Sequence, residues 1–277
     1  MNEKKLEKLI TDGVITDLHL YDEVGSTNDM AREFAKNRIM KGDKSWVNEL
    51  FIAELQSSGK GRMGRDWDSP AGTGIWMSLA TRLKLSGDRM PGVTLLSALC
   101  VARVICSAAL QMGIQNIDVK IKWPNDIVVN KKKICGILTE LVSDPEGGGY
   151  VITGIGINTN TRYFPTDIVD KATSLFNESG VEWEREGLVA AIINMFSQYL
   201  KRYEMEQSLD FILQDYNSML ISLGEEVVIV DDGERREETY ISRGIDNTGA
   251  LLVEDSLGEV QRIISGEVSV RGILGYV

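Results

Sequence analysis

The feature that most constrains the fold of this 277-residue chain is a change of pattern near residues 221–224. Before that point, strand-like stretches are interleaved with stretches of helical spacing, the longest over about residues 92–112. After it come five short strand-like segments, EEVVIV, ETYISRGI, ALLVED, EVQRII and GEVSVRG, separated by turn sequences such as DDGE, DNTG and DSLG. We therefore predict a mixed α+β domain over residues 1–221 and a small β-barrel domain over residues 222–277.

Net charge and cysteine content argue against nucleic-acid binding, membrane binding, a disulfide framework and a zinc cluster. The net charge of −11 argues against general binding to nucleic acid or to anionic membranes, because both attract basic surfaces. Cys100, Cys106 and Cys135 form no CxxC pair, which argues against a disulfide framework or a zinc cluster. We therefore expect a cytoplasmic protein with no DNA partner and no membrane partner.

Three further features argue against a membrane span, a signal peptide and histidine-based catalytic or metal sites. The apolar run from Val93 to Leu110 is interrupted by Arg103, which predicts a buried helix rather than a membrane span. The first residues, MNEKKLEKLITDG, lack the apolar segment of a signal peptide. His19 is the only histidine, so we expect neither a histidine-based catalytic triad nor a histidine metal site.

A glycine-rich stretch, SSGKGRMGRDW over residues 57–67, concentrates three cations in this acidic chain. It is either an anion-binding loop or a solvated turn, because glycine allows close backbone approach and Lys and Arg pair with phosphate or carboxylate. The formal match to G-x-G-x-x-G does not indicate a dinucleotide fold, because the residues that follow are too rich in helix breakers. We refer to residues 59–67 as the glycine loop.

Four other motifs also have a structural and a functional interpretation. KWPND, at residues 122–126, is a good turn, but its Asn-Asp pair could also hold a nucleotide and magnesium. The lysines at 131–133 are typical of a solvated hairpin tip, although Lys133 starts the next strand and could point over the sheet. GIGIN, at 154–158, indicates close packing or close ligand approach. The stretch STN, at 26–28, is a helix cap or a polar ligand site.

Taken in order, these motifs resemble those of biotin protein ligases, and the similarity extends to the C-terminal segment that includes SGEVSVR at 265–271. The resemblance implies a mixed β-sheet with packed helices, like the core of class II synthetases, followed by an SH3-like barrel. It also implies a two-step reaction. Biotin and ATP give biotinyl-5'-AMP with the help of Mg²⁺, and a lysine of a biotin carboxyl carrier domain then takes the biotin. A homodimer is left open.

The resemblance assigns roles to individual residues. Lys133, Arg62 and Lys60 are expected to supply the catalytic positive charge. The expected biotin-binding residues are Ser26, Thr27, Asn28, Gln56, Gly59, Lys60, Gly61, Arg62, Lys133 and Gly136. The expected ATP-binding residues are Arg65, Trp67, Lys122, Asn125, Asp126 and Asn158, of which Asp126 is also the expected metal ligand.

The sequence departs from the family pattern at two places. Lys60 stands where the family more often has arginine, which replaces a planar fork by a point charge. The segment before Asp17 is expected to be too short for the DNA-binding domain of the regulatory members. Two alternatives remain open, a lipoate ligase and a non-enzymatic biotin sensor, although GKGRMGRDW favours biotin and the retained charged residues favour an enzyme.

Overall fold

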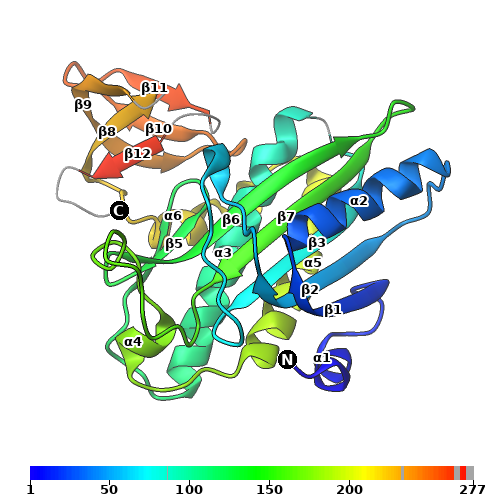
Figure 1. The fold of residues 1–277 in the computed structure, drawn as a ribbon. Helices are drawn as coiled ribbons and strands as arrows, with labels where there is room; N and C mark the ends of the chain where they lie inside the picture. The colour runs from blue at the N-terminus through cyan, green and yellow to red at the C-terminus, as the bar shows by residue number, and fades with distance from the viewer. Residues whose placement is uncertain (86, 232–233, 265–268, 273–277) are drawn as a thin grey trace.

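The computed structural model describes residues 1–85, 87–231, 234–264 and 269–272. Seven strands form one mixed sheet in the order β1-β2-β3-β7-β6-β5-β4 (Figure 1). β1 and β2 run parallel, and the other five neighbouring pairs run antiparallel. The strands are β1 (Asp17–Val24), β2 (Asn48–Gln56), β3 (Ile75–Leu83), β4 (Val119–Lys122), β5 (Asp126–Val129), β6 (Lys132–Ser143) and β7 (Gly149–Ile157).

Helices cover both faces of this sheet, and the period-two alternation of the strands supplies an apolar surface to each face. In β7, Val151 and Ile155 belong to the large core that includes α3 (Met90–Gln111) and α5 (Arg185–Glu206). Tyr150 and Ile152 instead pack in a smaller cluster with α2 (Thr27–Met40). The next residues on the α2 side of β7 are glycines, so that side of the sheet stays open beyond the helix.

Helix α3 is the central helix of the large core. It is the one helix among the described residues that is long and apolar enough to cross a membrane, but 67% of its most apolar window is buried inside the protein. At its more exposed side, Arg103 donates a hydrogen bond of 3.0 Å to the Tyr199 hydroxyl of α5. The prediction of a buried helix over the apolar run is therefore confirmed.

Three shorter helices complete the N-terminal part. Helix α1 (Glu3–Leu9) packs against α5, and neither α1 nor α4 (Leu175–Ser179) was expected from the sequence pattern. The start of α4 is capped by Ser174, whose Oγ accepts a hydrogen bond of 3.1 Å from the Asn177 N–H. The helices are α1 (Glu3–Leu9), α4 (Leu175–Ser179) and α6 (Leu213–Met219), and single 3₁₀ turns lie at Arg62–Gly64, Gly87–Arg89 and Asp210–Ile212.

The last five strands form a separate antiparallel sheet in the order β11-β10-β9-β8-β12 (Figure 1). They are β8 (Glu226–Asp231), β9 (Glu234–Ile245), β10 (Leu251–Glu254), β11 (Val260–Ile263) and β12 (Ser269–Gly272). The start of the predicted SGEVSVR segment, residues 265–268, and the turn residues 232–233 lie outside the described residues. The predicted mixed sheet with packed helices and a small C-terminal β unit is confirmed, whereas the domain boundary near residue 221 stays a prediction.

Several hydrogen bonds attach this C-terminal sheet to the rest of the protein, and two of them reach the KWPND turn and helix α6. The buried Trp123 Nε1 donates to the Gly249 carbonyl at 3.1 Å, and the Ile245 N–H donates to Asn217 Oδ1 at 2.9 Å. Trp123 lies between β4 and β5, within the KWPND motif. The C-terminal sheet therefore supports the turn that carries Asn125.

Candidate active site

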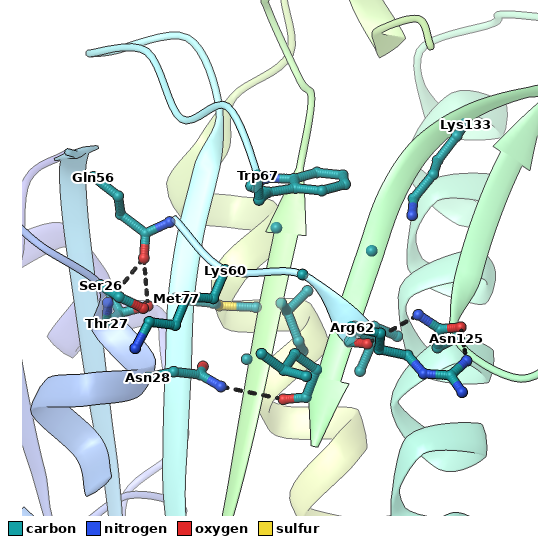
Figure 2. Close-up of a pocket in the computed structure, with 17 residues that line it drawn as sticks. Ser26, Thr27, Asn28, Gln56, Lys60, Arg62, Trp67, Met77, Asn125 and Lys133 are labelled. Atoms are coloured by element: carbon teal, nitrogen blue, oxygen red, sulfur yellow. Dashed lines mark hydrogen bonds between the residues drawn. The ribbon is translucent and has the colours of Figure 1, made fainter. Parts of the chain in front are cut away.

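A pocket opens on the α2 side of the sheet, where β7 carries glycine instead of large side chains (Figure 2). Its empty space is about 450 Å³, a volume that includes space open to solvent. The start of α2, the end of β2, the glycine loop and strands β3, β6 and β7 all contribute to its wall. The lining residues are Ser26, Thr27, Asn28, Gln56, Lys60, Gly61, Arg62, Trp67, Met77, Asn125, Lys133, Gly136, Ile137, Leu138, Gly154, Ile155 and Gly156.

One end of the pocket is formed by uncharged polar groups, and the Lys60 ammonium beside them is paired with Asp29. Gln56 Oε1 accepts a hydrogen bond of 2.8 Å from the Thr27 N–H, while Gln56 Nε2 donates to Ser69 Oγ at 2.9 Å. The Ser26 side chain makes no capping hydrogen bond to α2, so the helix-cap interpretation does not account for its hydroxyl. This end presents hydroxyl, amide and backbone groups fixed in position.

Ser78, which the sequence analysis did not single out, contacts two residues of this polar end and holds them in place. Its hydroxyl is fully buried, donates to Asn28 Oδ1 at 2.6 Å and lies 2.7 Å from the Thr27 hydroxyl. The sequence signal was a serine between the apolar residues Met77 and Leu79 of the strand IWMSLATRL. A buried hydroxyl at such a position needs partners, and here the partners are pocket residues.

Three glycines allow the pocket walls to approach the sheet closely. A Cβ on Gly154 would lie 2.1 Å from Asn28 Oδ1, and a Cβ on Gly156 would lie 2.5 Å from Trp67 Nε1. Gly136, the register partner of Gly156 on β6, would place its Cβ 2.9 Å from the same indole ring. The indole of Trp67 therefore lies directly against the glycine pair, and any side chain there would displace it.

The other end of the pocket is cationic. Lys133 Nζ lies 2.7 Å from Asp126 Oδ1 and 5.1 Å from the centre of a Trp67 ring. Arg62 Nη1 donates to Asn125 Oδ1 at 2.8 Å, and burial lowers the pKa of the Arg62 guanidinium from its ordinary value. Lys131, by contrast, is exposed in the turn before β6. One lysine of the KKK run thus faces the pocket while a neighbour faces solvent.

The glycine loop is held at its base. The Trp67 N–H donates to the Gly59 carbonyl at 2.9 Å, and the Gly61 N–H donates to the Arg65 carbonyl at 2.7 Å. A Cβ on Gly59 would lie 2.3 Å from the Trp67 carbonyl oxygen, so glycine is required for this closure. Gly59 supports the loop but does not line the pocket.

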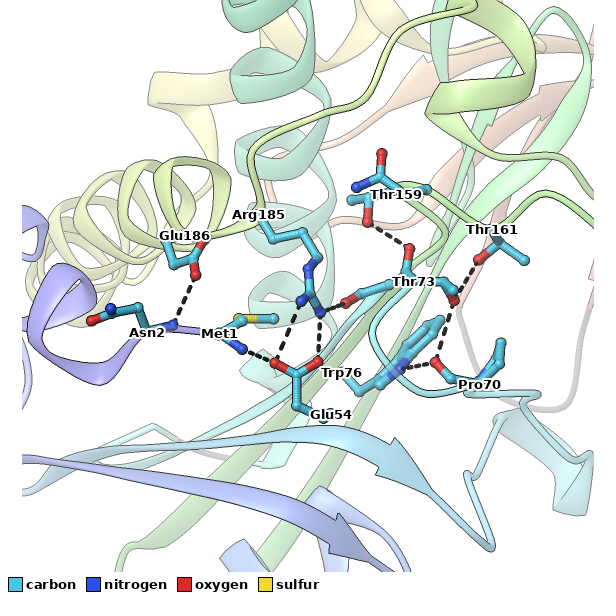
Figure 3. Close-up of polar contacts among 12 residues, drawn as sticks. Met1, Asn2, Glu54, Pro70, Thr73, Trp76, Thr159, Thr161, Arg185 and Glu186 are labelled. Carbon is cyan, nitrogen blue, oxygen red and sulfur yellow. Dashed lines mark hydrogen bonds and ion pairs between the residues drawn. The ribbon is translucent and has the colours of Figure 1, made fainter.

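The segment that leads from the glycine loop into β3 is fixed by a second polar cluster (Figure 3). Arg185 of α5 donates to Glu54 Oε2 at 2.8 Å and to the Gly74 carbonyl at 3.0 Å. Thr159 Oγ1 donates to the Thr73 carbonyl at 2.9 Å. Hydrogen bonds from Arg185 and Thr159 therefore hold the backbone that connects the glycine loop to β3.

Four more of the expected ligand residues lie outside the lining of the pocket. Asn158 is buried, and its Nδ2 donates to the Thr173 carbonyl at 3.2 Å. Lys122 is buried on β4, Arg65 is exposed on the glycine loop, and Asp126 reaches the site through Lys133. Their assignments to ATP stay predictions.

Two family profiles match the chain. That of the "Biotin/lipoate A/B protein ligase family" matches residues 26–158, and that of the "Biotin protein ligase C terminal domain" matches residues 222–271. The "Bifunctional ligase/repressor BirA" of Bacillus spizizenii is 36% identical over 251 residues, which are 89% of this chain and 72% of that protein. The chain belongs to the biotin protein ligase family.

Two further similarities agree with membership of the biotin protein ligase family. The "Biotin--[acetyl-CoA-carboxylase] ligase" of Mycobacterium tuberculosis is 26% identical over 91% of this chain and 88% of that protein. A solved biotin protein ligase from Aquifex aeolicus, in complex with biotin and ATP, has a TM-score of 0.76 and 29% identity, and covers 93% of this chain and 99% of that one. The predictions of the family, the fold and an ATP-using biotin ligase are confirmed.

Proposed function

We propose that this chain attaches biotin to a lysine of a biotin carboxyl carrier domain in two steps. In the first step, a carboxylate oxygen of biotin attacks the α-phosphorus of ATP and pyrophosphate leaves, which gives biotinyl-5'-AMP. In the second step, the lysine amine attacks the acyl carbon, AMP leaves, and the amine loses a proton. The observation that carries this proposal is a single pocket with a neutral polar end, a cationic end and the glycine loop beside both.

The neutral end suits the ureido ring of biotin, which presents one carbonyl acceptor and two N–H donors. Thr27 and Gln56 offer both kinds of partner, and their hydrogen bonds to each other and to Ser69 hold them in place. A preorganised site loses less conformational entropy when the ligand binds. We therefore place the ring of biotin at this end, next to Ser26 and Asn28.

The cationic end suits the reacting groups. The biotin carboxylate and the α-phosphate are both anions, and fixed positive charge offsets their repulsion as they approach. Lys133 supplies this charge from β6 and Arg62 supplies it from the glycine loop, and both lie at the end of the pocket that Asn125 lines (Figure 2). We assign to Lys133 the contact with both anions.

Asp126 is the residue that would hold magnesium together with the phosphates of ATP. Its buried Oδ1 pairs with Lys133 Nζ at 2.7 Å, and a carboxylate is the kind of oxygen donor that a hard cation prefers. No group of three acidic, cysteine or histidine side chains gathers in the described part of the chain, so the phosphates would complete the ligand set. The metal would supply charge neutralisation for the phosphates.

The nucleotide-binding residues, the location and the partners expected from the sequence are also part of the proposal. Arg65 and Trp67 would act on the nucleotide from the glycine loop, with Lys122, Asn125 and Asn158 on the side of the KWPND motif. The cytoplasm is the expected location, a carboxylase carrier domain is the expected partner, and no DNA partner is expected. A homodimer remains open.

Transfer to a carrier domain tests this proposal directly. The purified chain is incubated with biotin, ATP, Mg²⁺ and an isolated biotin carboxyl carrier domain, and the mass of the carrier is measured. We expect the carrier to gain one biotinyl group, and a carrier with its acceptor lysine replaced by arginine to gain none. Transfer of lipoate but not biotin would refute the proposal in favour of the lipoate ligase.

A further inference from the structure

The ammonium of Lys60 is engaged by a carboxylate rather than directed at the cationic end of the pocket. Its Nζ lies 2.7 Å from Asp29 Oδ1 and 2.6 Å from Asp29 Oδ2. Asp29 lies in the first turn of α2, directly after the pocket residues Thr27 and Asn28. The glycine loop is thus joined to the helix that forms the polar end.

A second cation fixes the position of Asp29. Arg32, one turn further along α2, donates to Asp29 Oδ1 at 2.7 Å and also pairs with Glu140 of β6. Glu140 Oε2 in turn accepts a hydrogen bond of 2.8 Å from Asn28 Nδ2. These contacts form a continuous series of alternating cations and carboxylates, namely Lys60, Asp29, Arg32 and Glu140. The series reaches the pocket residue Asn28 through Glu140.

The glycine loop has a different attachment on the far side of the pocket. There Arg62 donates to Asn125 at 2.8 Å, so the loop contacts α2 through one cation and the KWPND turn through another. In Figure 2 the Lys60 side chain extends toward the start of α2, whereas Arg62 lies at the other end of the pocket beside Asn125. The hydrogen bonds at the base of the loop, at Gly59 and Gly61, involve neither Lys60–Asp29 nor Arg62–Asn125.

We propose that Asp29 is a positioning residue that latches the glycine loop over the pocket through Lys60. The proposal deepens the proposed function and rests on it for the consequence that the latch retains biotinyl-5'-AMP until the acceptor lysine arrives. Lysine suits this role because a point charge can lie between both oxygens of one carboxylate. The latch predicts that loss of the Asp29 charge loosens the loop.

Limited trypsin digestion of the full chain without ligands tests the latch separately from any activity. Cleavage after Arg62 and Arg65 is measured in wild type, Asp29→Asn, Lys60→Gln and the double variant. We expect each single variant to be cleaved roughly two- to fivefold faster, the factor that an exposed ion pair contributes to an equilibrium. The double variant should be cleaved no faster than either single variant, and Lys60→Arg should behave like wild type.

A matched control uses the other end of the same helix. Arg38 pairs with Asp43 at 2.7 Å just beyond α2, and Asp43→Asn should leave cleavage of the glycine loop unchanged. Wild-type rates in Asp29→Asn would overturn the latch. So would equal acceleration by Asp43→Asn, because the effect would then come from general loosening of α2.

Release of the adenylate gives a second readout whose sign separates two roles for Lys60. If Lys60 is latched, Asp29→Asn should speed the escape of biotinyl-5'-AMP relative to its formation. If Lys60 instead contacts the ligand phosphate, removing Asp29 would free the ammonium and slow the escape, which would overturn the proposal. A wild-type chain that forms no adenylate would refute the proposed function, while the digestion rates would still decide the latch.

Discussion

Replacing Lys133 by alanine should reduce formation of the adenylate by about 10- to 150-fold. A hydrogen bond to a charged group contributes roughly 1.5 to 3 kcal/mol, and each 1.4 kcal/mol changes a rate about tenfold. The substitution should also destabilise the protein, because it leaves Asp126 without its cation. The two side chains are 25% and 15% exposed, so we expect a loss of about 1 to 3 kcal/mol, between the values of exposed and fully buried pairs.

The assay is exchange of labelled pyrophosphate into ATP in the presence of biotin, with stability measured by urea denaturation. Lys131→Ala is the matched control, since that lysine lies two residues away and faces solvent. It should leave both the exchange rate and the unfolding free energy within experimental error of wild type. Near-wild-type exchange in Lys133→Ala would refute the assignment of the catalytic charge and leave this lysine as the ion-pair partner of Asp126 only.

Three other changes have defined outcomes. Gly156→Ala should displace Trp67, cost about 1 to 3 kcal/mol of stability and weaken ATP binding. Gly87→Ala should do neither, because a Cβ on Gly87 meets no atom of the described residues within 4 Å beyond its chain neighbours; equal effects of the two variants in denaturation and ATP titration would contradict the packing argument. Biotin with ATP should slow trypsin cleavage between residues 60 and 66 more than biotin alone, because the adenylate supplies partners for the loop cations; an unchanged rate would show that the loop does not close on the ligand. Deleting residues 224–277 should lower the melting temperature and raise the KM for ATP, because Trp123 loses its partner on Gly249; a truncated chain with wild-type values would refute a supporting role for the C-terminal sheet.

Several features of the pocket were predictable from the sequence because they depend on local chemistry. The glycines of GIGIN indicated close approach, and the structure places Asn28 and Trp67 against two of them. Lys133 was expected to differ from its neighbours because it starts a strand, where side chains alternate between faces. Such positional arguments need only the period of the element and the properties of the residue type.

Other features depend on contacts between distant parts of the chain. Asp29 and Glu140 look like ordinary surface carboxylates in the sequence, and Arg32 joins them only because α2 packs beside β6. For the same reason, the KKK run did not indicate an ion pair for Lys133, whereas the β5–β6 pairing places Asp126 beside it. No local pattern encodes these pairs, since both partners are polar and tolerated at any exposed position.

The most direct test of the central claim is pyrophosphate exchange by the unmodified chain with biotin or lipoate as the only acyl substrate. The first half-reaction needs no carrier domain, so the result depends on the pocket alone. We expect label to enter ATP when biotin and Mg²⁺ are present, and to stay at background with lipoate or without an acyl substrate. Exchange with lipoate but not with biotin, or with neither, would contradict the assignment of this pocket to biotin activation.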